Sequence, residues 1–260
     1  MSIKPLKHLG QNFLTDKNIS AKIAASLDAP QDGRVIEIGP GEGAMTEFLF
    51  QKYPAMTALE VDERAVEHLN RRFPSLDVKN KDILKTDWNN LLGEADEKAW
   101  VIGNLPYYIT SPILFSVLDN YRRFEQAVFM VQKEVAERIC SSAGTKAYGI
   151  LSVQTQFLAK ATMLFTVPRH VFRPVPGVDS AVIKITMNDS APVCSPKALK
   201  TVVRTAFNQR RKKLRNALAP ITGKQAISEF DLTRRAEELS VQEFADLTIL
   251  LQQRGMIQQD

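Results

Sequence analysis

The sequence predicts an α/β fold: a doubly wound, mainly parallel sheet with an antiparallel edge strand, followed by a small all-helical C-terminal domain. Short apolar runs alternate with helical patterns between residues 34 and 158, as βα units do. Two further β-rich runs, 161–167 and 181–187, are joined by a stiff proline-rich loop, which favours an antiparallel return at the sheet edge. Beyond a short linker only helical patterns occur, at 197–207, 211–218, 224–229 and 240–254, and a capping box of Ser240 and Glu243 opens the last one. We therefore expect domains at 1–189 and 190–260.

The composition is that of an ordinary globular chain. Of its 260 residues, 44% are hydrophobic and 24% are charged, and no apolar run is long enough to cross a bilayer. Cys140 and Cys194 lie far apart and the three histidines are scattered, so the spacing of a metal site is missing. We therefore expect a cytoplasmic protein with reduced thiols, no metal and no membrane partner.

The first predicted strand, 34–38, runs into a glycine loop that contains Gly39 and Gly41, and a helical pattern follows at 45–52. Glycines let a ligand approach the backbone, and the helix start offers free N–H groups. The spacing is Gly-x-Gly-x-Gly, unlike that of nicotinamide dinucleotide binders. This loop alone indicates a ligand site only weakly.

Acidic residues follow the next two predicted strands. Glu60 ends the strand 56–61, 19 positions after Gly41, and Asp82 follows the strand 76–79. In doubly wound sheets an acid at the end of the second strand accepts hydrogen bonds from ribose hydroxyls. Asp82 could accept from an adenine amine while Ile83 packs on the ring. The pair predicts a nucleoside-containing cofactor, although Glu60 alone could be an exposed acid that caps the next helix.

The fourth predicted strand, 100–102, delivers the loop GNLPYY at 103–108. Leu105 precedes Pro106 and is therefore held extended, so the Asn104 side chain and the carbonyl of Leu105 or Pro106 are available acceptors beside the flat ring of Tyr107. Acceptors next to an aromatic plane suit an adenine base. The alternative is an ordinary exit from a strand into a turn. After this loop, Ser111 and Pro112 are expected to open a helix as its N-cap and first-turn proline.

Two other segments are candidates for contact with a ligand. Residues 1–16 form a basic arm with a compact apolar-aromatic element at 11–14. This arm is either a loosely held tether or a lid. In the proline-rich loop, Phe172 is the one large aromatic. It is equally suited to stack on a base or to plug the local core.

The formal charge is +5, and it is distributed unevenly: residues 190–228 contain nine Lys or Arg and no acid. A solvated basic helix is the alternative, but such a run favours a nucleic-acid contact. The candidate RNA-binding residues are Arg210, Arg211, Lys212, Lys213 and Arg215.

Taken together, these motifs resemble those of the ribosomal RNA adenine dimethyltransferases, and most closely the bacterial small-subunit (kasugamycin-sensitivity) branch. The resemblance covers nearly the whole chain. It rests on GQNFL at 10–14, EIGPGEG at 37–43, EVD at 60–62, KD at 81–82, GNLPY at 103–107, VFRP at 171–174, VDSA at 178–181 and RRK at 210–212.

The resemblance implies a Rossmann-like methyltransferase sheet and S-adenosylmethionine as cofactor. The implied cofactor contacts are Asn12, Leu14, Gly39, Gly41, Glu60, Asp82, Ile83 and Asn104. The target base would lie against Asn104, Leu105, Pro106 and Tyr107, with Phe172 on its other face.

The implied substrate is a pair of adjacent adenines in a hairpin loop near the 3′ end of small-subunit rRNA, within a pre-30S particle, and the implied state is a monomer. Two alternatives stay open: a 23S rRNA methylase of the erythromycin-resistance type and a non-catalytic RNA-binding assembly factor.

Overall fold

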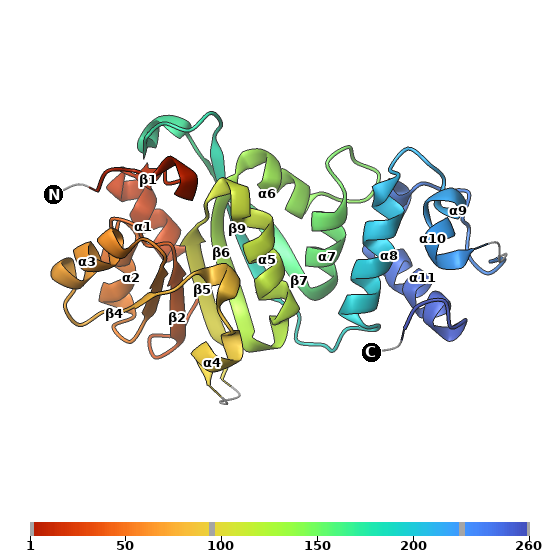
Figure 1. Ribbon diagram of the computed structural model, residues 1–260, viewed down its shortest axis with the longest axis horizontal. Coiled ribbons are helices and arrows are strands. Elements are labelled where there is room, and N and C mark those ends of the chain that lie inside the picture. Colours follow the sequence, from red (N-terminus) through yellow and green to blue (C-terminus); the bar gives the residue numbers. More distant parts are fainter. Residues whose placement is uncertain (1–2, 94–96, 224–226, 259–260) are drawn as a thin grey trace. The chain divides into compact units, whose positions relative to one another are not determined.

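The computed structural model describes residues 3–93, 97–223 and 227–258 (Figure 1). The chain divides into two compact units. One comprises Met1–Ala136 with Thr162–Met187, and the other comprises Glu137–Ala161 with Asn188–Asp260.

The first unit is built on a mixed sheet. In spatial order its strands are β4 (Asp77–Asn80), β3 (Thr57–Glu60), β2 (Arg34–Ile38), β5 (Ala99–Asn104), β6 (Phe124–Gln132), β9 (Ser180–Met187) and β7 (Ala159–Val167). The pairs from β4 to β6 are parallel, and β9 is antiparallel to β6. The predicted fold class, a parallel core with antiparallel pairing toward one edge, is confirmed.

The strand order reverses between β2 and β5, and ligands bind at such a reversal in open α/β sheets. The two strands approach closely there. A Cβ on Gly103 would lie only 2.7 Å from the carbonyl oxygen of Ile38, so glycine is required at this position of β5.

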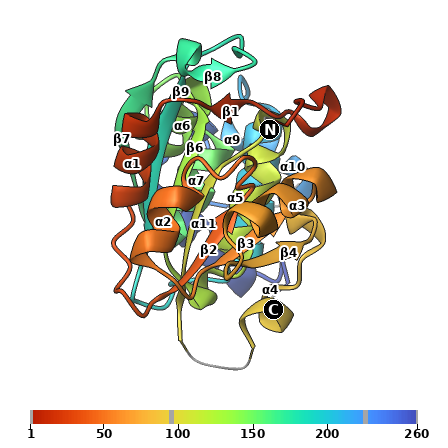
Figure 2. The same ribbon diagram turned by 90° about the vertical axis from the view of Figure 1, so that its left-hand side faces the viewer.

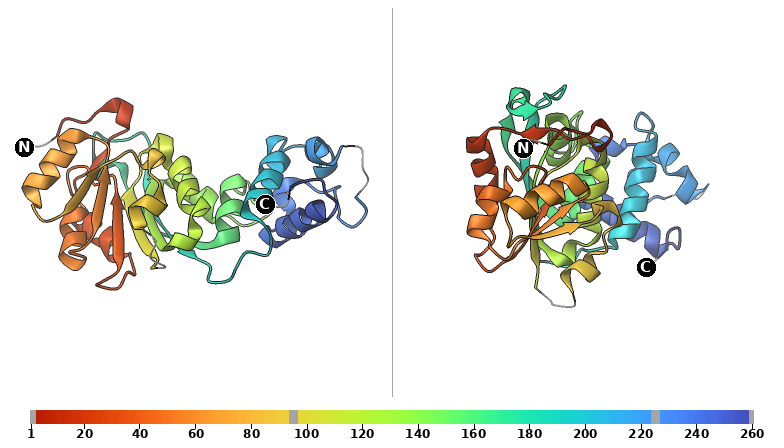
Figure 3. Two further views of the ribbon diagram at one scale, coloured as in Figure 1. Left: turned by 60° about the horizontal axis from the view of Figure 1, so that its bottom comes forward. Right: turned by 60° about the vertical axis from the view of Figure 1, so that its left-hand side comes forward.

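Helices of the same unit flank the sheet (Figure 3). They are α1 (Lys17–Ala25), α2 (Thr46–Lys52), α3 (Glu63–Arg72), α4 (Trp88–Leu92) and α5 (Thr110–Asp119). The chain passes from the first unit to the second within α6 (Lys133–Cys140), and α7 (Ile150–Leu158) belongs to the second unit. The main core joins α1 and α2 to the strands through buried side chains such as Ile23, Leu49, Val35 and Val128.

The expected start of α5, with Ser111 as N-cap, is wrong. The helix begins at Thr110 without a side-chain cap. The hydroxyl of Thr110 donates to the carbonyl of Pro106 at 3.2 Å, and the 3-10 turn η3 (Tyr107–Ile109) leads directly into the helix. Local turn geometry therefore replaces the cap.

The second unit is helical, with α8 (Pro196–Asn208), α9 (Leu214–Ala217), α10 (Ala219–Thr222) and α11 (Val241–Gln253). The capping box of α11 is confirmed, since Ser240 and Glu243 each bond the other's backbone N–H. Tyr148 and Val153 from the α7 region share the core of this unit with Val203 and Phe244. The division after residue 189 stays a prediction.

The helix expected at 211–218 in the basic segment is wrong for its first residues, 211–213. Residues 209–213 form a turn, and Lys213 makes a β-bridge with Arg235. The N–H groups of Leu214 and Arg215 donate to the carbonyls of Arg234 and Leu232, so extended pairing competes with helix formation here.

Of the helix expected at 224–229, residues 224–226 lie outside the described residues, and 227–229 are not helical. Within the described part of the chain, no helix is both long enough and apolar enough to span a membrane.

Candidate active site

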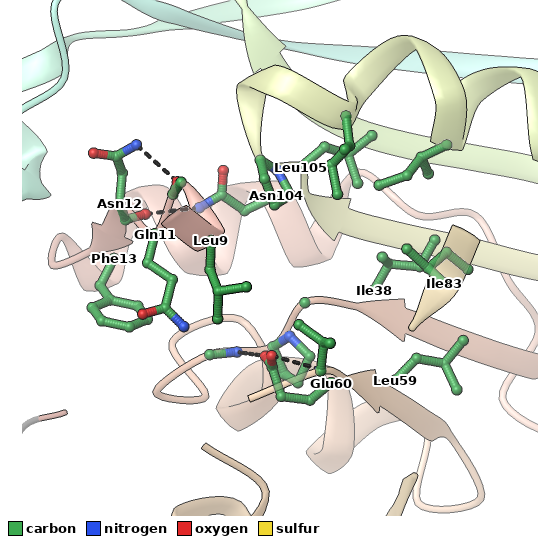
Figure 4. A pocket seen from close by; sticks show the side chains of 18 of the residues that line it. Leu9, Gln11, Asn12, Phe13, Ile38, Leu59, Glu60, Ile83, Asn104 and Leu105 are labelled. Carbon is green, nitrogen blue, oxygen red and sulfur yellow. Dashed lines mark hydrogen bonds between the residues drawn. The ribbon is translucent and has the colours of Figure 1, made fainter. Parts of the chain in front are cut away.

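A cavity lies at the carboxyl ends of β2, β3 and β5, where the strand order reverses (Figure 4). It brings together eleven of the twelve residues that the sequence predicted for cofactor and target base. They are Asn12, Leu14, Gly39, Gly41, Glu60, Asp82, Ile83, Asn104, Leu105, Pro106 and Tyr107.

The N-terminal arm closes against the cavity. Its strand β1 (Phe13–Leu14) pairs antiparallel with β8 (Phe172–Arg173) in the proline-rich loop, and Figure 2 shows the two side by side. The backbone N–H of Thr15 donates to the carbonyl of Val171 at 2.9 Å. Segments more than 150 residues apart in sequence are thus hydrogen-bonded beside the cavity.

The glycine loop accommodates the arm at Gly41, which has no side chain. Gly41 has φ +55°, and a Cβ there would lie 2.9 Å from the ring of Phe13. On the other side of the arm, the Gln11 amide donates to Asp62 at 2.8 Å. The arm is therefore anchored to two of the loops that follow parallel strands.

The Asn104 side chain is oriented by the arm. Its Nδ2 donates to the backbone carbonyl of Asn12 at 3.1 Å, a contact drawn in Figure 4. The amide nitrogen is therefore engaged, and Oδ1 is the atom that can accept from a ligand.

Tyr107 is half-buried, and its hydroxyl lies 2.8 Å from the hydroxyl of Ser180 on β9. Burial raises the pKa of Tyr107 above its usual value, so the phenol stays neutral at physiological pH. The hydrogen bond holds the ring between the loop and the antiparallel strand.

The Glu60 carboxylate is buried, and backbone N–H groups take the place of water around it. One of its oxygens accepts from the N–H of Gly41 at 3.0 Å, and the other accepts from Val61 and Asp62. Burial raises the pKa of Glu60, and these three hydrogen bonds oppose the shift. A carboxylate has acceptor sites beyond these three, which suits it to a hydroxyl donor.

Asp82 caps the short helix η2 (Ile83–Lys85) by accepting from the N–H of Leu84 at 2.9 Å. Its second oxygen lies 3.9 Å from the ammonium of Lys85. One carboxylate oxygen of Asp82 thus holds the loop, and the residue lines the cavity.

Phe172 is placed apart from the other predicted site residues. It is only 3% exposed, packs in the main core with Leu14 and Val182, and is not among the residues that line the cavity. Of the two roles that the sequence left open for it, a plug in the local core matches this placement.

Several cavity residues had no predicted role. Gln11 and Phe13 lie within a motif that the sequence already singled out, whereas Tyr108 follows directly after Tyr107 in the target-base loop. Glu37 does not line the cavity: it lies on β2 just before the glycine loop, is fully buried, and accepts a hydrogen bond from Thr46 on its Oε2 at 2.6 Å. An acid inside an otherwise apolar strand was the available signal for it.

The predicted RNA-binding residues are all exposed. Arg210 differs from the rest because its guanidinium pairs with Glu237 at 2.7 Å and donates to the carbonyl of Lys146 at 2.6 Å. It therefore also holds the turn in place.

The family model described as ribosomal RNA adenine dimethylase matches residues 4–253. The chain belongs to this family. Among curated dimethylase relatives, the "Ribosomal RNA small subunit methyltransferase A" of Salinibacter ruber is 47% identical over 94% of this chain and 84% of its own length. The protein of the same name from Parabacteroides distasonis is 44% identical over 96% and 95%.

Solved structures agree with this fold. A dimethyladenosine transferase from Plasmodium falciparum superposes with a TM-score of 0.78 at 24% identity, covering 94% of this chain and 98% of its own. The 23S rRNA methyltransferase ErmE superposes with a TM-score of 0.70 at 25% identity, covering 92% and 99%. This member of the dimethylase family thus has the methyltransferase architecture that its sequence predicted.

Proposed function

We propose that this protein dimethylates the exocyclic N6 amine of two adjacent adenines in a hairpin loop near the 3′ end of small-subunit rRNA. The methyl donor is S-adenosylmethionine. The observation that carries the proposal is the orientation of Asn104, whose Nδ2 is bound by the Asn12 carbonyl at 3.1 Å and whose Oδ1 is left as an acceptor at the cavity.

The residues at the cavity fit the cofactor. Glu60 offers a buried carboxylate for ribose hydroxyls, and Ile38, Leu59 and Ile83 offer apolar walls for a ring. Gly41 lines the cavity and leaves room for the ring of Phe13 in the arm. We assign Asn12 and Leu14 to the methionine end, Gly39 and Gly41 to the loop contact and Asp82 to the adenine. When bound, S-adenosylmethionine supplies an electrophilic methyl group.

The loop after β5 would hold the target amine through two acceptors. Asn104 Oδ1 is one. The carbonyl of Pro106 already accepts from the N–H of Ile109 and the hydroxyl of Thr110, which uses both of its lone pairs. We therefore assign the second acceptor to the carbonyl of Leu105, with Tyr107 as the flat face beside the base.

These acceptors act by positioning. Gripping both amine hydrogens turns the nitrogen lone pair out of conjugation with the purine ring, so the amine becomes a better nucleophile. Fixed dipoles that are aimed before the reaction need no reorganisation during it. Reaching the amine requires an unstacked base, which a hairpin loop supplies.

The proposed substrate particle is a pre-30S subunit, recognised by a monomer in the cytoplasm, with 190–260 as the RNA-binding domain. The relatives named for the small subunit are 44–47% identical to this chain, whereas the 23S enzyme ErmE is 25% identical. This difference favours the small subunit over the large one. Asn104 and Tyr107 at the cavity speak against a purely non-catalytic assembly factor.

The test is transfer of tritiated methyl groups from S-adenosylmethionine to unmethylated small and large subunits, with the labelled nucleotides identified. We expect N6,N6-dimethyladenine in small-subunit rRNA only. Asn104→Ala should lower the rate about 100-fold or more, the loss typical when one preorganised polar contact is removed.

The matched control is Asn90→Ala, which truncates an exposed asparagine on α4 and should leave the rate unchanged. Wild-type rates in a folded Asn104→Ala variant would remove Asn104 from the mechanism. Label in large subunits alone would transfer the assignment to the 23S class.

A further inference from the structure

Tyr108 is the most exposed aromatic side chain at the mouth of the cavity. It lines the cavity, yet 59% of the residue is accessible to solvent. Its neighbour Tyr107 is half-buried and hydrogen-bonded to Ser180. An exposed aromatic ring beside a ligand site offers a face on which a planar base can stack.

The ring of Tyr108 is supported from behind by the arm. A Cβ on Gly10 would lie 3.0 Å from both Cδ1 and Cε1 of Tyr108 and 3.6 Å from Pro106. Gly10 has φ +61° and ends the 3-10 turn η1 (Lys7–Leu9). The backbone of the arm therefore packs directly against the ring, which limits the freedom that Tyr108 would lose on binding a planar partner.

The position of Tyr108 in the chain defines what it can touch. Asn104 and Leu105 carry the acceptors assigned to the target amine, and Tyr108 follows in η3, on the outer rim of the same loop. A base held by that loop brings its neighbouring nucleotide to the rim, because consecutive nucleotides are covalently joined.

We propose that Tyr108 stacks on the base next to the target adenine and thereby positions the RNA for methyl transfer. This inference rests on the proposed function. It assigns to the chain a substrate-positioning residue that reads a planar base without hydrogen bonds, a contact typical of single-stranded RNA recognition.

Three variants separate stacking from packing against the arm. Tyr108→Phe keeps the ring, Tyr108→Leu keeps apolar bulk against Gly10 without a stacking face, and Tyr108→Ala removes both. Tyr121→Ala is the control, because Tyr121 is a partly exposed tyrosine in the 3-10 turn η4 (Tyr121–Arg123) and does not line the cavity.

The measurements are calorimetric affinity for S-adenosylmethionine, the KM and kcat for unmethylated small subunits, and the fluorescence of a hairpin RNA with 2-aminopurine beside the target adenine. We expect Tyr108→Leu and Tyr108→Ala to raise the KM for RNA about tenfold, within the range found for loss of one base–aromatic stack. Quenching of 2-aminopurine should disappear in both variants, while Tyr108→Phe and Tyr121→Ala match the wild type and cofactor affinity stays constant.

The inference is overturned if Tyr108→Leu retains the wild-type KM and quenching. It is also overturned if Tyr108→Leu weakens cofactor binding as much as RNA binding, since the residue would then act through the arm. In both of these cases the proposed function stands, provided that the wild-type protein transfers methyl groups to small subunits. Failure of the wild type to label any rRNA would overturn the function itself.

Discussion

Two buried carboxyl groups near the cavity differ in the number of hydrogen bonds that the protein donates to them. Glu60 accepts three backbone N–H groups. Glu37 has only the Thr46 hydroxyl on Oε2, and its Oε1 has no hydrogen-bond partner. Burial accordingly raises the pKa of Glu37 to about 8, so it is mostly neutral in the folded protein at neutral pH.

This pKa shift predicts how stability depends on pH. Below the usual pKa of 4.5 the Glu37 carboxyl is protonated in both the folded and the unfolded chain. Between 4.5 and about 8 the unfolded chain releases the proton and the folded chain keeps it. The contribution of Glu37 to the free energy of unfolding therefore falls as pH rises through this window and is constant above it.

Glu37→Gln, which has nearly the same shape and does not titrate, should remove this contribution. We expect its urea midpoint relative to wild type to increase steadily from about pH 5 to pH 8. Glu63→Gln, at an exposed position at the start of α3, is the control and should parallel the wild type. Equal pH profiles for wild type and Glu37→Gln would show that Glu37 is ionised in the fold.

At the scale of elements, the N-terminal arm is held by contacts with residues that are distant in sequence. Phe13 is buried with Ile3 and Ala65 in a small cluster separate from the main core. The two-residue strand β1, whose Leu14 packs in the main core, adds to the attachment. So do the hydrogen bonds from Gln11 to Asp62, from Asn104 to the Asn12 carbonyl and from Thr15 to the Val171 carbonyl. So small a buried cluster allows the arm to open without unfolding the sheet.

Phe13→Ala should therefore act locally. Loss of a buried phenylalanine costs about 3–5 kcal/mol, enough to populate the open arm and to lower the apparent affinity for S-adenosylmethionine roughly tenfold or more. Titration calorimetry measures the affinity, and thermal unfolding should show a smaller change than truncation in the main core.

Leu164→Ala serves as the control because this leucine is exposed on β7. The affinity of this variant for the cofactor should equal that of the wild type. An unchanged affinity in Phe13→Ala would mean that closure of the arm does not contribute to binding of the cofactor.

For the whole molecule, binding of rRNA is expected to depend on the exposed cations of 190–260. Arg211, Lys212 and Arg215 are exposed, whereas Arg210 is partly committed to Glu237 and Lys146. Each phosphate contact releases a counterion, which makes affinity fall steeply with salt.

Changing Arg211, Lys212 and Arg215 together to Ala should weaken RNA binding and reduce the slope of log K against log salt by about 2 to 3. Filter binding across a salt series measures both quantities. Arg71→Ala removes an exposed charge from α3 and should leave the slope close to wild type. If the triple variant keeps the wild-type slope, phosphates are bound by other residues.

Much of the fold and site was predictable because local patterns constrain a parallel sheet strongly. The acids and glycines after successive apolar runs had to meet, since the carboxyl ends of parallel strands share one edge. Eleven of the predicted cofactor and base contacts do line one cavity. The capping box at Ser240 was equally local and is confirmed.

The sequence by itself therefore determined the class of the sheet, which is mainly parallel with an antiparallel edge. It also determined which edge of the sheet carries the site and the residue types found there. Only the tertiary structure decided that Phe172 is core, that Arg210 is tied to Glu237 and that Asn104 is aimed by the Asn12 carbonyl 92 residues away. Periodicity reports which face of an element is buried, but it carries no information about which distant backbone group meets a given side chain.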